Sequence, residues 1–235
     1  MKVTYINHMG DDLTVVNAAR VSFAKKSEWE NQDDRIIETY SHEAGNVYHE
    51  DPSWKGKLSA RDISLITYLA ANEHWTPFAH PQISLHFKVP FFVAAQIKKH
   101  QVGFVVNEVS RRYVDSEPEL YKPEVWRKRA DNVKQGSSDE VVYLQEECIE
   151  SHLFADKLFY KALLERGVCP EQARMVLPLS TYTEFWMTGS LYGWSRLYSQ
   201  RTDPNAQRET AEVARQVGEI IAPLFPASWR ALVNE

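Results

Sequence analysis

The stretch "QISLHFKVPFFVAAQIKKHQVGFVVNEVSRRY", residues 82–113, contains the clearest secondary-structure pattern in the chain. Its first eight residues alternate strictly, with these apolar side chains on one side: Ile83, Leu85, Phe87 and Val89. Alternation with a period of two is typical of a β-strand that lays one face on a core, so we predict a strand over 82–89. Pro90 fits the first turn of a helix, where its missing N–H costs nothing, and we therefore predict a helix over 90–100.

The end of this helix and the residues after it place hydrogen-bonding groups around the apolar centre "GFVV". Gln96, Lys99 and His100 stand at positions i, i+3 and i+4, so they would share one helical face. Four more polar groups then follow within six positions: Asn107, Glu108, Ser110 and Arg112. An arginine fork, a hydroxyl and loop N–H groups together suit a phosphate. The same residues also suit a capped, solvated loop, and the residues alone leave both interpretations open.

Before this stretch, turn-forming residues and the spacing of apolar residues predict three segments. Residues 25–57 are rich in Asn, Asp, Gly and Pro, which indicates a long polar excursion with one short helical piece over 35–40. Apolar residues recur at helical spacing within 60–72, so we predict an amphipathic helix there. A turn follows at "HWTPFAH", residues 74–80.

Beyond the opening stretch the chain favours helices. A capping-box pattern at residues 137–140 predicts the start of a long helix that Gly167 ends. A proline opens and another closes a short helix over 170–178, and an aromatic-rich helix is predicted over 183–200. Pro204 then predicts the start of the last helix. No internal repeat and no interdomain linker is visible.

The composition is that of a globular protein, with 43% hydrophobic and 25% charged residues. We expect one domain over residues 1–235. No apolar run approaches the roughly 20 residues that span a bilayer, and the N-terminus has no signal-peptide core, so we expect a cytoplasmic protein without a membrane partner. The net charge of -5 argues against nucleic-acid binding, which usually relies on a basic surface.

The sequence shows neither a metal-binding pattern nor an activated nucleophile. The two histidines of the "HWTPFAH" turn lack the further ligands that a metal needs. Cys148 and Cys169 are isolated, have no histidine beside them in sequence, and are expected to be inert packing residues. Arg174 and Arg201 lie on separate predicted helices near apolar residues, where they need anionic or carbonyl partners. Internal salt bridges would satisfy them as well as a ligand would.

Five blocks, taken in order, resemble the flavin-dependent thymidylate synthases: "AARVSF", "HWTPFAH", "QIKKHQ...NEVSRRY", "ARMVLP" and "QRTDPNAQRE". The family's signature is an Arg-His-Arg triplet followed by Asn-Glu-x-Ser-x-Arg-Tyr, and its second half is intact at residues 107–113. The resemblance spans nearly the whole chain. It implies an α+β fold with an antiparallel β-sheet flanked by helices, in a homotetramer whose active sites lie between subunits.

The resemblance also implies a reaction. The methylene group of methylenetetrahydrofolate would be moved to C5 of dUMP, and FAD reduced by NADPH would supply the hydride that makes it the methyl group of dTMP. The family does not use a covalent cysteine, which agrees with the missing nucleophile. Charge developing on the uracil would instead be met by placed donors. The implied partners are dUMP and folate, with no metal and no nucleic acid.

The site residues follow by matching the family's motifs onto this sequence. The implied dUMP site consists of Gln96, Lys99, Glu108, Ser110, Arg112, Arg174 and Arg201. Within it, Arg201 and Ser110 are the implied catalytic residues, and Arg201 falls at the uracil-contacting position. The implied FAD site consists of Ser22, His74, Thr76, Lys99, His100, Gln101, Asn107, Arg196 and Asn205.

The chain departs from the family at several positions. Lys99, His100 and Gln101 stand where the family has Arg-His-Arg, and the spacer to the second half of the signature is one residue longer, with Gly103 as the extra residue. Lysine is a point charge without the bidentate fork, so we expect weaker binding of the flavin phosphates. Four family residues, Asn, Arg, Asn and His, are also replaced by Ser190, Tyr192, Arg196 and Asn205. Arg196 would restore a charge there.

These departures leave two other functions open. The altered triplet is compatible with a relative that acts on another pyrimidine nucleotide or adds a hydroxymethyl group. A non-catalytic nucleotide-binding homologue that has lost flavin is the third hypothesis. The retained Arg112, Arg174 and Arg201 argue against it, since an unused site has no reason to keep such cations.

Overall fold

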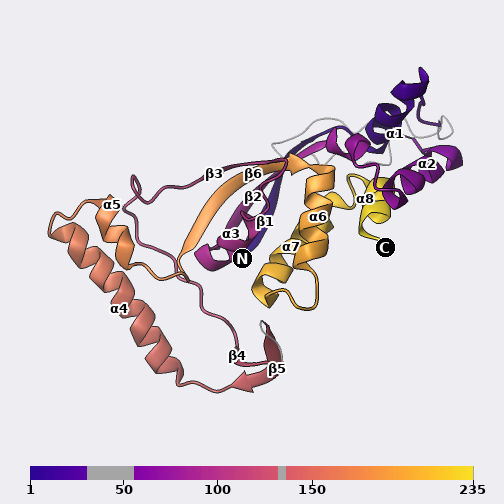
Figure 1. The fold of residues 1–235 in the computed structure, drawn as a ribbon. Helices are drawn as coiled ribbons and strands as arrows, with labels where there is room; N and C mark the ends of the chain where they lie inside the picture. Colours follow the sequence, from indigo (N-terminus) through magenta and orange to yellow (C-terminus); the bar gives the residue numbers. More distant parts are fainter. Residues whose placement is uncertain (31–55, 132–135, 235) are drawn as a thin grey trace, which may run out of the picture.

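The computed structural model describes residues 1–30, 56–131 and 136–234 of the chain. At its centre lies a four-stranded antiparallel sheet in the order β1-β2-β6-β3 (Figure 1). The strand bounds are Lys2–Met9 for β1, Gln82–Pro90 for β2, Phe104–Glu108 for β3 and Tyr182–Ser190 for β6. The short helical piece predicted over 35–40 lies outside the described residues, as does most of the polar excursion.

The strand predicted over 82–89 is confirmed, and its apolar side forms the centre of the core. Phe87 stacks on Phe185 of β6 with 4.8 Å between ring centroids, and its ring lies 6.0 Å from that of Trp194. The indole N–H of Trp194 donates to the carbonyl oxygen of Ile83 at 3.1 Å. The core therefore joins β2, β6 and the helix that carries Trp194.

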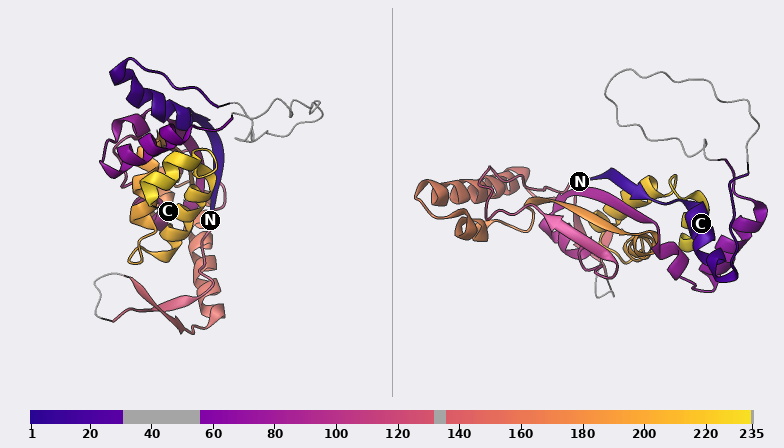
Figure 2. Two further views of the ribbon diagram at one scale, coloured as in Figure 1. Left: turned by 90° about the vertical axis from the view of Figure 1, so that its right-hand side faces the viewer. Right: turned by 90° about the horizontal axis from the view of Figure 1, so that it is seen from above.

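The helices near the sheet form two groups (Figure 2). α3, α6 and α7 pack on the buried face of the sheet, while α1, α2 and α8 pack together at one end of it. Their bounds are Phe91–Ile97 for α3, Leu191–Arg201 for α6, Arg208–Ile221 for α7, Asp12–Arg20 for α1, Ala60–Ala71 for α2 and Pro226–Val233 for α8. Two short 3-10 helices, η1 and η3, span Val21–Phe23 and Thr76–Ala79. The α+β class, with an antiparallel sheet flanked by helices, is confirmed.

A third part of the chain extends from the opposite end of the sheet (Figure 1). It contains the two-stranded ribbon β4–β5, the long helix α4, the short helix α5 and the 3-10 helix η4. Their bounds are Trp126–Arg129, Ser137–Val142, Glu146–Glu165, Pro170–Ala173 and Arg174–Val176. Gly167, with φ +86°, follows the C-terminus of α4 as predicted. No helix among the described residues is long and apolar enough to cross a bilayer.

The long helix predicted from residue 137 starts later than expected. Residues 137–142 form β5, because Val142 pairs with Trp126 of the ribbon. Pairing with β4 and β-branched side chains outweigh the local capping-box pattern, and α4 begins only at Glu146.

The helix predicted over 183–200 is wrong in its first half. Residues 182–190 form β6, in which Phe185 and Met187 point to the core while Trp186 is exposed on the other side. The residues alternate between buried and exposed as in a strand, but the many aromatic side chains led us to predict a helix. The helix predicted from Pro204 begins instead at Arg208.

The helix predicted over 90–100 is shorter than expected. It ends at Ile97, so Lys99 and His100 follow in a turn and do not share a helical face with Gln96. The apolar centre after them forms β3, an edge strand that pairs with β6. An edge strand accounts for the mixture of apolar and polar residues in this stretch, because only part of such a strand is covered by the rest of the protein.

Gly189 in β6 is required by the packing of β3. A Cβ atom at this position would lie 2.2 Å from the ring of Phe104, its neighbour in the ladder. We predict that Gly189→Ala destabilises the fold by about 1–3 kcal/mol through overpacking, measured as the free energy of unfolding in urea. Glu184→Ala, at an exposed position of the same strand, is the control and should cost less than about 0.5 kcal/mol. Equal losses in the two variants would contradict the clash.

Candidate functional site

A first cavity, of about 440 Å³, lies where β3 ends, and we call it the Ser110 pocket. Three residues of the predicted dUMP site line it: Glu108, Ser110 and Arg174. Glu108 is held from two sides, by the ammonium group of Lys98 at 2.5 Å and by the hydroxyl of Thr183 at 2.8 Å. The carboxylate of Glu108 is therefore fixed at the wall of this pocket.

Two predicted phosphate-binding arginines gather beside the Ser110 pocket. Nε of Arg112 donates to the Glu171 carboxylate at 3.1 Å, and Nε of Arg174 donates to the backbone carbonyl of Glu171 at 3.3 Å. Arg112 and Glu171 are about half exposed, so their ion pair contributes little stability and an anionic ligand can replace it. The turn at Ser110 closes with the backbone N–H of Tyr113 donating to the Ser110 carbonyl at 3.0 Å. Positive charge and a hydroxyl thus converge at this end of the sheet.

A second cavity, of about 510 Å³, is the Arg201 pocket. Gln96, Arg201 and Asn205 of the predicted sites line it. The guanidinium of Arg201 is held in place: one terminal nitrogen donates to the backbone carbonyl of Gln96 at 3.0 Å, and Nε donates to Nε2 of His100 at 2.9 Å. Arg201 is therefore oriented by the end of α3 and the turn after it.

His100 accepts this hydrogen bond as a neutral imidazole. Burial, together with the charge of Arg201, lowers the pKa of His100 from 6.5 to about 4. As an implied FAD residue, His100 can therefore offer a hydrogen bond but not a positive charge. At neutral pH His100 positions Arg201 and carries no charge.

The lowered pKa of His100 predicts a specific acid sensitivity. Below pH 6.5 the unfolded chain takes up a proton at this residue, and the folded chain does so only near pH 4, so stability is lost as pH falls between these values. We expect the free energy of unfolding of the wild type to fall more steeply over this interval than that of His100→Asn. Parallel profiles for the two proteins in urea titrations at several pH values would contradict the assignment.

The three predicted nucleotide-binding arginines do not share one cavity within a single chain. Phe91, at the start of α3, lines the Ser110 pocket, and Gln96, near its end, lines the Arg201 pocket. The helix thus separates the Arg112 and Arg174 side chains from that of Arg201. Each pocket alone holds only part of the predicted dUMP set.

The predicted flavin residues form two groups. Ser22 in η1, together with His74 and Thr76 at η3, is exposed near the end of the sheet where α1 and α2 lie. Beside them, Trp75 lies 5.9 Å from the ring of Tyr192 at the start of α6. The second group comes from α6, the turns after α3 and α6, and strand β3: Lys99, His100, Gln101, Asn107, Arg196 and Asn205.

This donor set fits a dinucleotide flavin. The side chains of Lys99 and Arg196 are exposed and have no hydrogen-bond or ion-pair partner within the part of the chain that the structure describes. Two such cations suit a diphosphate, and the exposed Trp75 suits a ring. These roles stay predictions.

Residues that the sequence did not assign to either site also line the Arg201 pocket. Arg127 and Ser137 come from the β4–β5 ribbon, and Gln207 precedes α7. Gln207 lies in the quoted block "QRTDPNAQRE", so it could have been chosen. Arg127 could not, because the ribbon that carries it was not predicted.

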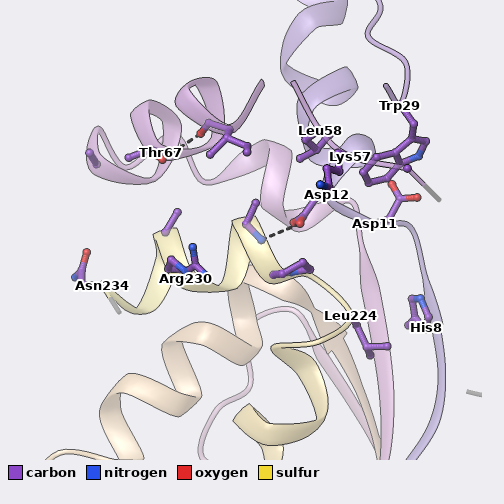
Figure 3. A pocket seen from close by; sticks show the side chains of 16 residues that line it. His8, Asp11, Asp12, Trp29, Lys57, Leu58, Thr67, Leu224, Arg230 and Asn234 are labelled. Carbon is purple, nitrogen blue, oxygen red and sulfur yellow. Dashed lines mark hydrogen bonds between the residues drawn. The ribbon is translucent and has the colours of Figure 1, made fainter. Parts of the chain in front are cut away.

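A third cavity, of about 600 Å³, is lined by none of the predicted residues (Figure 3). It lies between α1, α2 and α8, and the carboxylate of Asp12 lies at its edge. Asp12 accepts hydrogen bonds from the backbone N–H groups of Ala227 at 2.8 Å and Ser228 at 2.9 Å, which caps the start of α8. The role of Asp12 is therefore structural.

Metal and thiol chemistry find no support in the described residues. No group of three or more His, Cys, Asp or Glu side chains among them could hold a metal ion. Cys148 and Cys169 are exposed, which corrects the expected packing role, since α4 and the segment after it extend away from the core.

Comparison with known proteins gives a family match over most of the chain. The family model described as thymidylate synthase complementing protein matches residues 4–227. A flavin-dependent thymidylate synthase of Thermus thermophilus is 34% identical over 235 residues, which cover 97% of this chain and 74% of that protein. The enzyme of the same description from Thermosipho africanus is 32% identical over 233 residues, covering 97% of this chain and 89% of that protein.

A solved structure shows the same fold. The UMP/dUMP methylase PolB from Streptomyces cacaoi, bound with 5-Br dUMP, aligns with a TM-score of 0.74 and 25% sequence identity. The alignment covers 99% of this chain and 94% of that chain.

Proposed function

This chain belongs to the flavin-dependent thymidylate synthase family, and from that premise we propose that it methylates dUMP at C5 to give dTMP. Methylenetetrahydrofolate supplies the carbon, and NADPH supplies the reducing equivalents through FAD. The observation that carries the proposal is that the family blocks, far apart in sequence, line two pockets at the two ends of α3.

The Ser110 pocket is proposed to bind the phosphate and sugar of dUMP. Arg174 and Arg112 supply guanidinium donors for phosphate oxygens, and the Ser110 hydroxyl supplies another donor. The carboxylate of Glu108 is held by Lys98, so it can accept a hydrogen bond from a sugar hydroxyl without moving. Lys99, in the turn at the other end of α3, is outside this pocket in one chain and is proposed to add a point charge to the assembled dUMP site.

The Arg201 pocket is proposed to bind the uracil ring. C5 must become electron-rich before it can attack the methylene carbon, and the oriented guanidinium of Arg201 would stabilise the enolate-like negative charge on a ring carbonyl oxygen that makes it so. Because neutral His100 and the carbonyl of Gln96 already hold Arg201, little reorganisation is needed during the reaction. No cysteine nucleophile takes part in this scheme.

The residues proposed to hold FAD are Ser22, His74, Thr76, Lys99, His100, Gln101, Asn107, Arg196 and Asn205. When bound, FAD supplies the hydride that reduces the transferred carbon to a methyl group. Lys99 and Arg196 neutralise the diphosphate, while Thr76 and His74 offer polar contacts beside the exposed Trp75. Neutral His100 contributes a hydrogen bond rather than a charge.

A homotetramer with shared sites is part of the proposal. Each chain offers two incomplete pockets, and α4 presents exposed apolar side chains: Phe154 at 66%, Leu158 at 55% and Phe159 at 56%. Such a face is typical of a subunit interface. The proposal also keeps a single domain over residues 1–235 and the cytoplasmic location inferred from the sequence.

The test is an activity assay on the purified protein. We expect a flavin absorbance spectrum and tritium release from dUMP labelled at C5 when methylenetetrahydrofolate and NADPH are supplied. Absence of release with flavin demonstrably bound would reject the proposed reaction.

UMP is a second candidate substrate, favoured by the likeness to a UMP/dUMP methylase. The two nucleotides differ only in the 2′-hydroxyl of the sugar. The same assay with labelled UMP separates them, and mass spectrometry of the product separates methyl from hydroxymethyl transfer.

A further inference from the structure

A continuous chain of side-chain contacts runs along the wall of the Arg201 pocket. A terminal nitrogen of Arg127 lies 2.7 Å from the Glu209 carboxylate. The amide nitrogen of Gln207 donates to the other carboxylate oxygen of Glu209 at 3.0 Å, and the amide nitrogen of Gln96 donates to Oε1 of Gln207 at 2.5 Å. Three of these residues, Arg127, Gln207 and Gln96, line the pocket itself.

Glu209 anchors this series of side-chain contacts. Its side chain is 9% exposed, lies in the first turn of α7 and faces Arg127, which is 16% exposed. Burial alone would raise the pKa of Glu209, but hydrogen bonds from its own backbone N–H, Arg127 and Gln207 lower it below its ordinary value. Glu209 is therefore a carboxylate, and the helix N-terminus adds to its stabilisation.

An ionised carboxylate fixes the direction of every hydrogen bond that follows. It only accepts, so Gln207 must turn its NH₂ group toward Glu209 and its carbonyl oxygen toward Gln96. That oxygen only accepts, so Gln96 must in turn use its own NH₂ group. The side-chain carbonyl oxygen of Gln96 is then left free to accept a hydrogen bond from a ligand in the pocket.

The pocket is thus lined by a donor, the guanidinium of Arg201, and by a free acceptor, the side-chain oxygen of Gln96. Arg201 can only donate, and it is bonded to the backbone of the same Gln96. A uracil ring carries a carbonyl oxygen next to an imide N–H, which matches this pair. A cytosine ring carries an unprotonated N3 where uracil has the N–H, so it would set two acceptors against each other.

We propose that the Arg127–Glu209 pair, acting through Gln207, fixes the amide of Gln96 as a hydrogen-bond acceptor and so selects uracil over cytosine nucleotides. The inference rests on the proposed function, because it takes a pyrimidine nucleotide as the ligand of this pocket. Arg127, Glu209 and Gln207 are positioning residues: they act through Gln96.

The experiment compares the dissociation constants of dUMP and dCMP by calorimetry on the full-length protein. The wild type should bind dUMP much more tightly than dCMP. In Glu209→Gln the carboxylate becomes an amide that can face either way, so the ratio of the two constants should fall roughly tenfold. Gln207→Leu changes an exposed residue and breaks the chain without removing a charge, so it should lower the ratio similarly even if Glu209→Gln folds poorly.

Glu212→Gln is the matched control, with the same chemical change at an exposed position of α7. Its ratio should equal that of the wild type. A wild type that binds dUMP and dCMP equally, or variants that weaken both nucleotides by the same factor, would overturn the inference and leave the proposed reaction standing. A wild type that binds neither nucleotide would overturn both.

Discussion

Arg201→Ala is expected to lower turnover of dUMP by roughly 10²–10³-fold, the effect of removing one preorganised donor from developing charge. The guanidinium lines the Arg201 pocket and is held by His100 and the Gln96 carbonyl. Arg201 is in no ion pair among the described residues, so its removal leaves no carboxylate unpaired there. Turnover is measured by tritium release, and the fold by circular dichroism.

Two further variants sharpen this result. Arg201→Lys keeps a charge but cannot donate to His100 and to Gln96 in the same fork geometry, so turnover should recover only in part. Arg215→Ala removes an exposed arginine from α7 and should leave turnover unchanged. Unchanged turnover in Arg201→Ala would show that the uracil binds elsewhere.

The fold was predictable where a local pattern and the tertiary environment agree. The alternation of β2 and the helical spacing of α2 both reflect a single buried face, so the sequence alone locates them. β6 shows where this fails. Its inward positions include Gly189, which has no side chain, and its outward positions include Trp186, which is apolar but exposed. The alternation of apolar and polar residues is therefore weak, and the same sequence is also compatible with a helix.

The ribbon β4–β5 depends on contacts distant in sequence. Its strands are short and polar, and Arg127 reaches Glu209, 82 positions later in the chain. No local pattern records such a contact. For this reason the family blocks indicate Gln96 and Arg201 in one pocket, while Arg127 is visible only in the structure.

The charge state of His100 could not be predicted from the sequence either. In sequence it stands beside lysines and suggests a cationic patch, but its pKa depends on burial and on Arg201, 101 positions away. Distances within the fold, and not neighbours in the chain, decide whether a histidine is charged.

Mixing two inactive variants is expected to restore activity. Arg174→Ala damages the Ser110 pocket and Arg201→Ala the Arg201 pocket, which lie apart within one chain. If each active site combines one pocket from each of two subunits, hybrids contain some sites with both arginines. Equal amounts assembled at random should recover roughly a quarter of the wild-type activity, because each site draws either arginine with even odds.

The hybrids are made by co-expression with two different affinity tags, and native mass spectrometry establishes their subunit composition. Arg174→Ala mixed with Arg174→Lys is the control, since both damage the same pocket and random assembly then restores no site with an intact Ser110 pocket. If hybrids form but recover no more than this control, then Arg174 and Arg201 serve a site within the same subunit. The two pockets, which α3 separates, would then have to come together through a movement within one chain. If the quarter is recovered, the two pockets are halves of sites completed by a neighbouring subunit.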